Sequence, residues 1–267
     1  MKNILKKIID NKKEKINEYK KKYSTDKILE IIKKNNNYID FIEKLRVRDV
    51  RGDLTIIAEI KKASPSAGIL IENFNYMDMA KAYIENQIGF LSVLTEEKFF
   101  LGDLKYIENI KNKYKVPILC KDFFIDTYQV ALAKSYGADC ILIILSAIDN
   151  KLAKDIYQAA NDLNMSTLVE VHSPAEAEVA LSFEKSLIGI NNRNLDTLEV
   201  SLNTTIDLIK IIDNHKNPLI CESGINTVED IEFIIENTGI YNFLIGESLI
   251  RSKSIAQKIK ELSQISL

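Results

Sequence analysis

The stretch TIIAEIK, residues 55–61, contains a short β-branched run followed by charged side chains, and similar runs recur along the rest of the chain. Such runs predict strands, and longer stretches of helical periodicity separate them. Eight strands are expected in all. The predicted strands are Thr55–Ile60, Phe90–Leu94, Pro117–Cys120, Asp139–Ile144, Thr167–Val171, Leu187–Ile190, Pro218–Cys221 and Tyr241–Ile245.

Eight helical segments alternate with these strands. Eight units over residues 55–267 average about 27 residues each, the size expected of an α/β fold of the (β/α)8 barrel type. A doubly wound open sheet is the alternative, since it produces similar alternation. The predicted helices are Met77–Gln87, Asp103–Lys113, Thr127–Ser135, Leu152–Leu163, Pro174–Leu181, Thr204–Asp213, Val228–Glu236 and Ile255–Leu262.

Composition limits the class of protein. Apolar residues make up 46% and charged residues 28%, which predicts a globular core and excludes wholesale disorder. The net charge of −2 argues against nucleic-acid binding by the whole domain and against a membrane partner. No apolar run approaches the ~20 residues that span a bilayer, and the amino terminus has no signal-peptide pattern. We therefore expect a cytoplasmic protein.

Cysteine and histidine are sparse. Cys120, Cys140 and Cys221 lie in apolar stretches without paired short spacing, which predicts free thiols in a reducing compartment. The two histidines, His172 and His215, form no cluster at ligand spacing. We therefore predict no metal site.

Residues 1–50 precede the first strand and are predicted to form a helical extension. A single barrel domain that spans residues 1–267 is expected, because no Gly/Pro-rich linker follows residue 55. Residues 1–34 hold twelve lysines against five acids. This pattern predicts an amphipathic helix with a lysine-rich outer face, which either packs passively or helps to gather an anionic substrate. Its apolar residues are Ile4, Leu5, Ile8, Ile9, Ile16 and Tyr19.

Polar groups end five of the predicted strands in the inward-facing register. Alternate residues of a barrel strand point inward, and those at the carboxyl end reach the face where barrel enzymes keep their active sites. Isolated charges in apolar strands are costly, so the set predicts a shared polar cavity. A simple ion pair between Glu59 and Lys61 is the alternative for the first strand. The inward-facing residues are Ile57, Glu59 and Lys61 in the first strand, Leu119 and Lys121 in the third, Leu168 and Glu170 in the fifth, Gly189 and Asn191 in the sixth, and Ile220 and Glu222 in the seventh.

Glycines follow the last two strands, in Glu222-Ser223-Gly224 and in Gly246-Glu247-Ser248. Loops after strands seven and eight of a barrel, with backbone amides near a helix start, form the usual phosphate cradle. We therefore expect a small phosphorylated substrate.

Several motifs together resemble the indole-3-glycerol-phosphate synthase family, and the resemblance extends over about residues 1–260. EIKKASPS at residues 59–66 is the most specific of them, and the order and spacing of the others also match. The remaining motifs are SVLTE at 92–96, KDF at 121–123, LVEVH at 168–172, GINNRNL at 189–195, ESGI at 222–225 and FLIGESL at 243–249.

The resemblance implies a carboxy-lyase of tryptophan biosynthesis that uses no cofactor and no metal. Its reaction closes 1-(2-carboxyphenylamino)-1-deoxyribulose 5-phosphate to indole-3-glycerol phosphate, with loss of carbon dioxide and water. Lys121 matches the general acid and Glu170 the carboxylate that assists proton removal, while Glu59 is a second carboxylate. Lys61 pairs with the substrate carboxylate or transfers a proton, so the order in which the two lysines act stays open.

The resemblance also assigns binding residues. Two alternatives remain, since Asn191 and Arg193 could brace a loop, and the two phenylalanines could be core aromatics rather than a wall for the anthranilate ring. The substrate-binding set is Asn191, Arg193, Glu222, Ser223, Phe100 and Phe123, and the phosphate-binding set is Ser64, Gly224, Gly246 and the backbone N–H of Glu247.

Three positions carry further expectations. Cys120 replaces an arginine common in the family and should point outward, and Asp103 replaces a serine and should cap the following helix. His172 is expected to point outside the barrel. Because the family's extension lies near the barrel mouth, its apolar residues should dock at the rim of the mouth, with the lysines facing outward to solvent or to the incoming phosphate and carboxylate. These apolar residues are Ile4, Leu5, Ile8 and Ile9. The family also leaves room for weak association with other tryptophan-pathway enzymes.

Two other functions compete with this interpretation. Phosphoribosylanthranilate isomerase shares the barrel, but its chemistry calls for a cysteine and an aspartate, whereas here Lys121 and Glu170 are inward and the cysteines are expected to face away. A catalytically silent scaffold is the second alternative, which a retained set of cavity charges disfavours. A steady-state assay separates all three.

Overall fold

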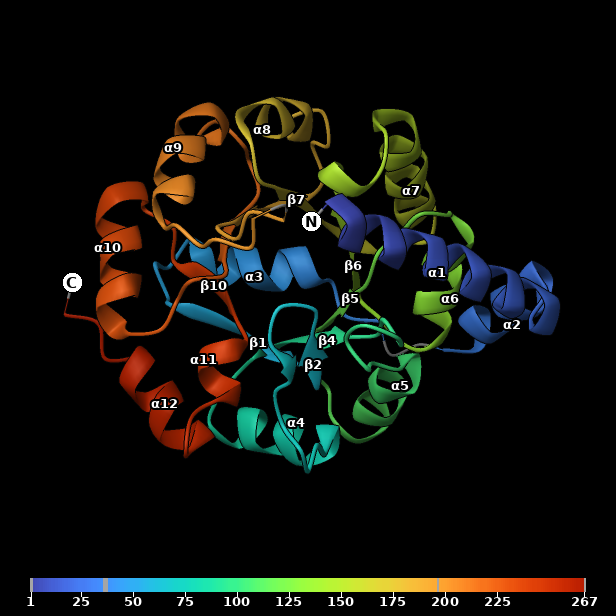
Figure 1. The fold of residues 1–267 in the computed structure, drawn as a ribbon, viewed down its shortest axis with the longest axis horizontal. Helices are drawn as coiled ribbons and strands as arrows, with labels where there is room; N and C mark the ends of the chain where they lie inside the picture. Colours follow the sequence, from blue (N-terminus) through green and yellow to red (C-terminus); the bar gives the residue numbers. More distant parts are fainter. Residues whose placement is uncertain (1, 36–37, 196, 267) are drawn as a thin grey trace.

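The computed structural model describes residues 2–35, 38–195 and 197–266, and eight parallel strands in it form a closed barrel in the order β1-β10-β9-β8-β7-β6-β5-β4. All eight predicted strands are confirmed, and the closed sheet excludes the open-sheet alternative. Figure 1 shows the helices as a ring around the strands. The barrel strands are β1 (Thr55–Ile60), β4 (Phe90–Leu94), β5 (Ile118–Lys121), β6 (Cys140–Ile144), β7 (Ser166–Val171), β8 (Leu187–Asn191), β9 (Leu219–Glu222) and β10 (Asn242–Ile245).

The eight predicted helices are also present, with ends shifted by at most two residues. Asp103 caps α5 by accepting a hydrogen bond from Lys105 N at 2.9 Å, as expected. The sequence did not predict the hairpin of β2 (Ala63–Ser64) and β3 (Gly68–Ile69) or the 3₁₀ turn at Leu145–Ala147, whereas α11 (Glu247–Ile250) is the helix start expected after Gly246. The predicted helices are α4 (Tyr76–Glu85), α5 (Leu104–Lys113), α6 (Tyr128–Ser135), α7 (Asn150–Asp162), α8 (Pro174–Ala180), α9 (Asn203–Ile212), α10 (Val228–Thr238) and α12 (Ile255–Leu262).

The extension differs from the single helix expected over residues 1–34. It contains α1 (Lys2–Lys22), α2 (Thr25–Lys34) and α3 (Phe41–Asp49), whereas Met1 and residues 36–37 lie outside the described residues. The helix breaks at Ser24, whose extended backbone lets its hydroxyl accept from Lys27 N at 3.3 Å. Serine competes for such caps and so ends α1 despite the continuous apolar periodicity.

Helix α3 closes the amino-terminal end of the barrel. Ile42 N donates to Ser166 Oγ at 3.3 Å, and the Asp49 carboxylate accepts from Asn242 Nδ2 at 2.6 Å, so α3 is tied to the starts of β7 and β10. Phe41 is fully buried and meets Phe90 edge to face, with ring centroids 5.0 Å apart. As far as the structure describes the chain, the mouth of the barrel is therefore at its carboxyl-terminal end.

The core has two layers, one inside the barrel and one between strands and helices. Cys120 and Cys221 lie in the outer layer, as strand alternation predicts, but Cys140 lies in the inner layer with Leu142. The expectation that all the cysteines face away was therefore wrong for Cys140, which shares the parity of the inward residues of β6. Its place at the start of that strand puts it at the closed end, and burial holds the pKa of its thiol well above the ordinary value.

Over the residues that the structure describes, no helix combines the length and the apolar character needed to cross a bilayer.

Candidate active site

A cavity of about 410 Å³ opens at the carboxyl ends of the strands, and every site residue expected from the sequence lines it. The parallel strands end at one edge, which is why residues more than 180 positions apart meet there. The lining includes Glu59, Lys61, Ser64, Phe100, Lys121, Phe123, Glu170, Asn191, Arg193, Glu222, Ser223, Gly224, Gly246 and Glu247.

Lys121 occupies the middle of the charged cluster. Its Nζ lies 2.6 Å from Glu222 Oε2 and 3.2 Å from Glu170 Oε2. Burial opposes its charge, but the two carboxylates outweigh burial and raise the pKa of Lys121 above its ordinary value. Lys121 is therefore a charged ammonium whose position in the cavity is fixed by the two carboxylates to which it donates.

Glu170 accepts hydrogen bonds at its other oxygen. Asn191 Nδ2 donates to Glu170 Oε1 at 3.1 Å, and His172 Nε2 lies 3.1 Å from the same atom. Burial alone raises the pKa of a carboxyl group, but Lys121, His172 and Asn191 together bring the pKa of Glu170 below its ordinary value. Glu170 is thus ionised and held from three sides.

His172 corrects the expectation that it points outside the barrel. Glu170 and His172 are two residues apart, so alternation places them on the same side. Besides Glu170, the imidazole approaches Glu176, with Nδ1 3.2 Å from Oε2. Burial lowers the pKa of His172, but the two carboxylates outweigh burial and raise it to about 9. The contact of His172 with Glu170 was not predicted from the sequence, although the parity of the two residues could have indicated it.

Glu222 differs from Glu170 in the direction in which its pKa is shifted. Burial raises its pKa to about 7, since the attraction of Lys121 does not offset both burial and the neighbouring charge of Glu170. Its Oε1 fills the space beside Gly189, where an added Cβ would lie 2.1 Å from that oxygen. Glycine at position 189 is what allows this carboxylate to lie flat against β8.

Glu59 and Lys61 form an ion pair with each other at the end of β1. The ion pair that the sequence left as an alternative is therefore present, yet both side chains line the same cavity as Lys121. A Cβ on Gly246 would lie 2.3 Å from Glu59 Oε1. Gly246 thus has a role that the sequence did not suggest, because it makes room for a carboxylate.

The glycine loops lie together at one side of the mouth. Ser223 and Gly224 both have left-handed backbone, with φ of 65° and 86°, so this turn is strained at Ser223. The first-turn amides of α11 have no acceptor within the helix. The carboxylate of Glu247 pairs with Arg251 Nε at 2.8 Å and with Arg193 at 3.5 Å. Because two arginines engage the Glu247 carboxylate, the backbone N–H is the group of Glu247 that could bind phosphate. The contact of Arg193 with Glu247 also braces the loop.

Aromatic and aliphatic side chains form the opposite wall. The rings of Phe100 and Phe123 lie 6.1 Å apart between centroids. Helix α1 crosses the mouth, and Ile4, Leu5 and Ile8 line the cavity, so docking at the rim is confirmed. The lysines of α1 were expected to face outward, which is wrong for Lys12, a residue only 3% exposed.

The cavity can hold a flat apolar group beside Phe100 and an anion beside the glycine loops, with an ammonium and carboxylates between them. Such a site suits proton transfer to and from a bound organic anion. Within the described part of the chain, no group of three or more His, Cys, Asp or Glu side chains could hold a metal ion.

Several solved structures are similar to the chain in fold. The chain matches 3-hexulose-6-phosphate synthase from Salmonella typhimurium with a TM-score of 0.63 and 14% identity, covering 79% of this chain and 97% of that one. It matches thiamine phosphate pyrophosphorylase from Pyrococcus furiosus with a TM-score of 0.56 and 16% identity, covering 80% and 95%. At these identities the likeness shows the fold alone.

Sequence relatives are much closer. Indole-3-glycerol phosphate synthase of Chromobacterium violaceum is 41% identical over 223 residues, which are 84% of this chain and 83% of the relative. That of Alkaliphilus metalliredigens is 39% identical over 259 residues, which are 97% of each chain. The family model for indole-3-glycerol phosphate synthase matches residues 5–262. The cavity, its charged cluster and these matches together identify the chain as a member of the indole-3-glycerol phosphate synthase family.

Proposed function

We propose that this barrel closes 1-(2-carboxyphenylamino)-1-deoxyribulose 5-phosphate to indole-3-glycerol phosphate, with Lys121 as the general acid. The observation that carries the proposal is the position of Lys121 Nζ between Glu170 and Glu222 at the base of the cavity. An ammonium held by two carboxylates is directed at a bound carbonyl oxygen without needing to reorganise.

In the first step, the ring carbon that bears the carboxylate bonds to the ketone carbon of the substrate. The carbonyl electron pair moves to oxygen, where charge develops, and Lys121 donates a proton to it. Carbon dioxide then leaves from the same ring carbon, and its bonding electrons restore the aromatic ring. Lys61 would pair with the substrate carboxylate before carbon dioxide leaves, because its ammonium lies at the cavity wall. Glu59 is the counter-ion of Lys61 in the structure.

In the second step, the new hydroxyl group takes up a proton from one of the two cavity ammonium groups, Lys61 or the reprotonated Lys121, and leaves as water. Glu170 accepts the proton released from the carbon next to nitrogen, which completes the indole ring. Because Asn191 and His172 hold Glu170 Oε1, the other oxygen remains beside Lys121. The acid and the base are thus adjacent, and the proton gained by one can replace the proton lost by the other.

The remaining lining residues would bind the two ends of the substrate. Phe100 and Phe123 provide the apolar wall for the anthranilate ring. Ser64 and the backbone near Gly224, Gly246 and Glu247 would hold the phosphate group.

The direct test is incubation of the purified protein with the carboxyphenylamino-deoxyribulose phosphate in excess chelator, followed by indole fluorescence. We expect turnover without any added metal or cofactor. Absence of turnover, or turnover only after a divalent ion is restored, would contradict the proposal or its metal independence, respectively.

The pH dependence of kcat/KM should be bell-shaped, with limbs near pH 7 and pH 9. As pH falls through about 7, Glu222 takes up a proton and its pairing with Lys121 weakens. As pH rises through about 9, His172 loses its proton and Glu170 loses a charged neighbour. Steady-state rates across pH 5–10 measure both limbs.

Two variants assign these limbs. Glu222→Gln cannot titrate and should abolish the acidic limb, whereas His172→Gln should abolish the alkaline limb and lower kcat by about tenfold. If either limb persists unchanged in its variant, the assignment of that limb is wrong.

Phosphate binding is tested by Gly224→Val, which should raise KM by about 10–100-fold. This is the factor expected when one hydrogen bond to a charged group is lost. A Cβ there would lie 2.8 Å from Val200 Cγ1 in a left-handed backbone, so the loop must move. Gly239→Val is the matched control, because Gly239 also has a positive φ of 71° but no neighbour within 4 Å. Equal KM changes in both variants would refute a phosphate role.

A further inference from the structure

Helix α1 carries one lysine within its apolar stripe. Ile4, Ile8, Lys12 and Ile16 follow one another at four-residue spacing, so they share one face of the helix. Ile8 and Lys12 are each 3% exposed and Ile16 is 5% exposed. A lysine is almost never this buried unless it is paired, so its partners define what α1 docks against.

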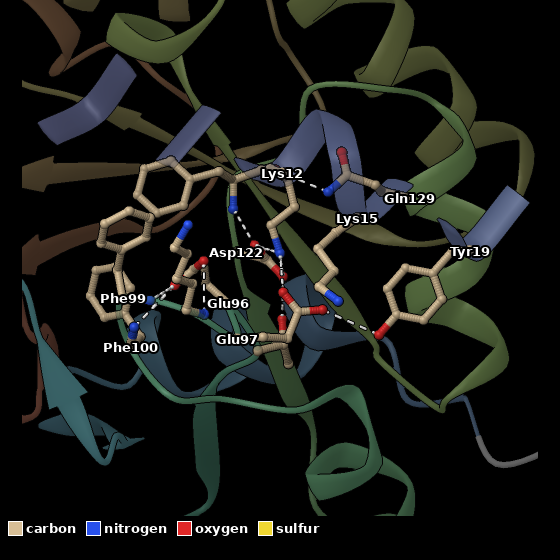
Figure 2. Close-up of polar contacts among 12 residues, drawn as sticks. Lys12, Lys15, Tyr19, Glu96, Glu97, Phe99, Phe100, Asp122 and Gln129 are labelled. Atoms are coloured by element: carbon tan, nitrogen blue, oxygen red, sulfur yellow. Dashed lines mark hydrogen bonds and ion pairs between the residues drawn. The ribbon is translucent and has the colours of Figure 1, made fainter. Parts of the chain in front are cut away.

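The partners of Lys12 come from two loops at the barrel mouth, as Figure 2 shows. Lys12 Nζ lies 2.9 Å from Glu97 Oε2, in the loop after β4, and 2.9 Å from Asp122 Oδ1, directly after β5. We call these three residues the Lys12 clamp. One ammonium thereby joins α1, the β4–α5 loop and the end of β5.

Other groups hold the two carboxylates from behind. Asp122 Oδ2 accepts from Thr95 Oγ1 at 2.7 Å, and Oδ1 accepts from Phe123 N at 2.7 Å. Glu97 Oε1 accepts from Tyr19 Oη at 3.2 Å, again on α1 (Figure 2). The clamp is therefore a connected network whose members have few alternative geometries.

Each segment that the clamp joins carries a wall of the active-site cavity. Asp122 lies between Lys121 and Phe123 in the chain, and α1 contributes Ile8. The β4–α5 loop contributes Phe100, whose N–H and that of Phe99 donate to the Glu96 carboxylate at 3.0 and 2.6 Å. A change in the clamp would thus move three walls relative to one another.

We propose that Lys12 is a positioning residue, which holds the amino-terminal helix and the two loops in the arrangement that binds substrate. The inference rests on the proposed function for its kinetic readout, and Lys12 itself is not expected to touch the reacting atoms. Replacing all members of a buried ion pair by apolar groups of similar volume often costs little stability, so the value of such a pair lies in fixing one geometry.

The kinetic test compares Lys12→Met, which keeps the volume of the side chain, with Lys13→Met. Lys13 is adjacent on the same helix, but its side chain is 64% exposed and pairs only with Asp10 at 3.6 Å among the contacts described. Lys12→Met should raise KM about tenfold with kcat changed less than about threefold, because the walls move and the acid and base remain. Lys13→Met should leave both values within about twofold.

Two further variants keep the test decisive. Lys12→Arg retains the charge and should bring KM back to within about threefold of wild type. Glu97→Gln removes one partner, should raise KM about threefold, and should add nothing to Lys12→Met in the double variant. If Lys12→Met does not fold, Glu97→Gln with unchanged KM overturns the proposal. A folded Lys12→Met protein with a lower Tm but wild-type KM shows a merely structural lysine and also overturns it.

Hydrogen exchange tests the clamp without the substrate. Amides of α1 should exchange at least about tenfold faster in Lys12→Met, while those of the barrel strands stay protected and Lys13→Met matches wild type. If wild-type protein does not turn over the substrate, the proposed function fails, and exchange alone decides the clamp. Unchanged exchange in α1 overturns the proposal in either case.

Discussion

Replacing Lys121 by alanine is expected to lower kcat by about 10²–10⁴ with the barrel still folded. The substitution removes the group that protonates the carbonyl oxygen and leaves Glu170 and Glu222 facing each other without their shared cation. Glu170→Gln should cause a loss in the same range, since an amide cannot accept the proton released in dehydration. Steady-state kinetics, with circular dichroism to verify folding, measures both effects.

The matched control is Lys115→Ala, which removes the same side chain at an exposed position before β5. It should leave kcat within about twofold, because an isolated surface charge contributes little. A Lys121→Ala protein that keeps near wild-type kcat would rule out Lys121 as the general acid.

Gly189→Ala should lower kcat by about 10²-fold, although the change adds only a single methyl group. The new Cβ would lie 2.1 Å from Glu222 Oε1 and 3.1 Å from Leu168 Cδ1. Glu222 must then move, and its other oxygen is the one held 2.6 Å from Lys121 Nζ. Overpacking at this buried position should also cost about 1–3 kcal/mol of unfolding free energy.

Gly89→Ala is the control for this prediction, since a Cβ there meets nothing within 4 Å. Its kcat should equal that of wild type. In a Glu222→Ala background the clash is absent, so adding Gly189→Ala should cost little further stability. Wild-type kcat in the single Gly189→Ala variant would show that Glu222 can move without disturbing the acid.

The barrel itself was predictable because its signals are local. Short β-branched runs such as Thr55–Ile60 and Phe90–Leu94 needed only their own residues to be identified as strands, and the structure confirms them with the same bounds. The inward register followed from alternation, which placed Lys121 and Glu222 on one side before any contact was known. Parallel strands then bring such ends together at one edge of the sheet.

The helix break at Ser24 and helix α3 were harder to predict. The break depends on competition between local signals, and α3 depends on packing against the barrel. The hydroxyl of Ser24 offers a cap that the apolar periodicity of residues 1–34 obscures. Helix α3 is short, and its amphipathic pattern has meaning only against the closed end of the barrel, where Phe41 and Leu45 are buried. Most of the stability of such a helix comes from packing rather than from propensity.

The sequence alone determined the fold class, the order of the strands' polar ends and, through its motifs, the family and the residues of the cavity. Only the tertiary structure decided how these residues are paired: Lys121 with Glu170 and Glu222, the Glu222 carboxylate beside Gly189, and Lys12 with Asp122, 110 positions away. The physical reason is that strand and helix periodicities are local properties of the chain. The partner of a buried charge is instead set by whichever distant groups the closed barrel brings within 3–4 Å, and no spacing in the sequence records that distance.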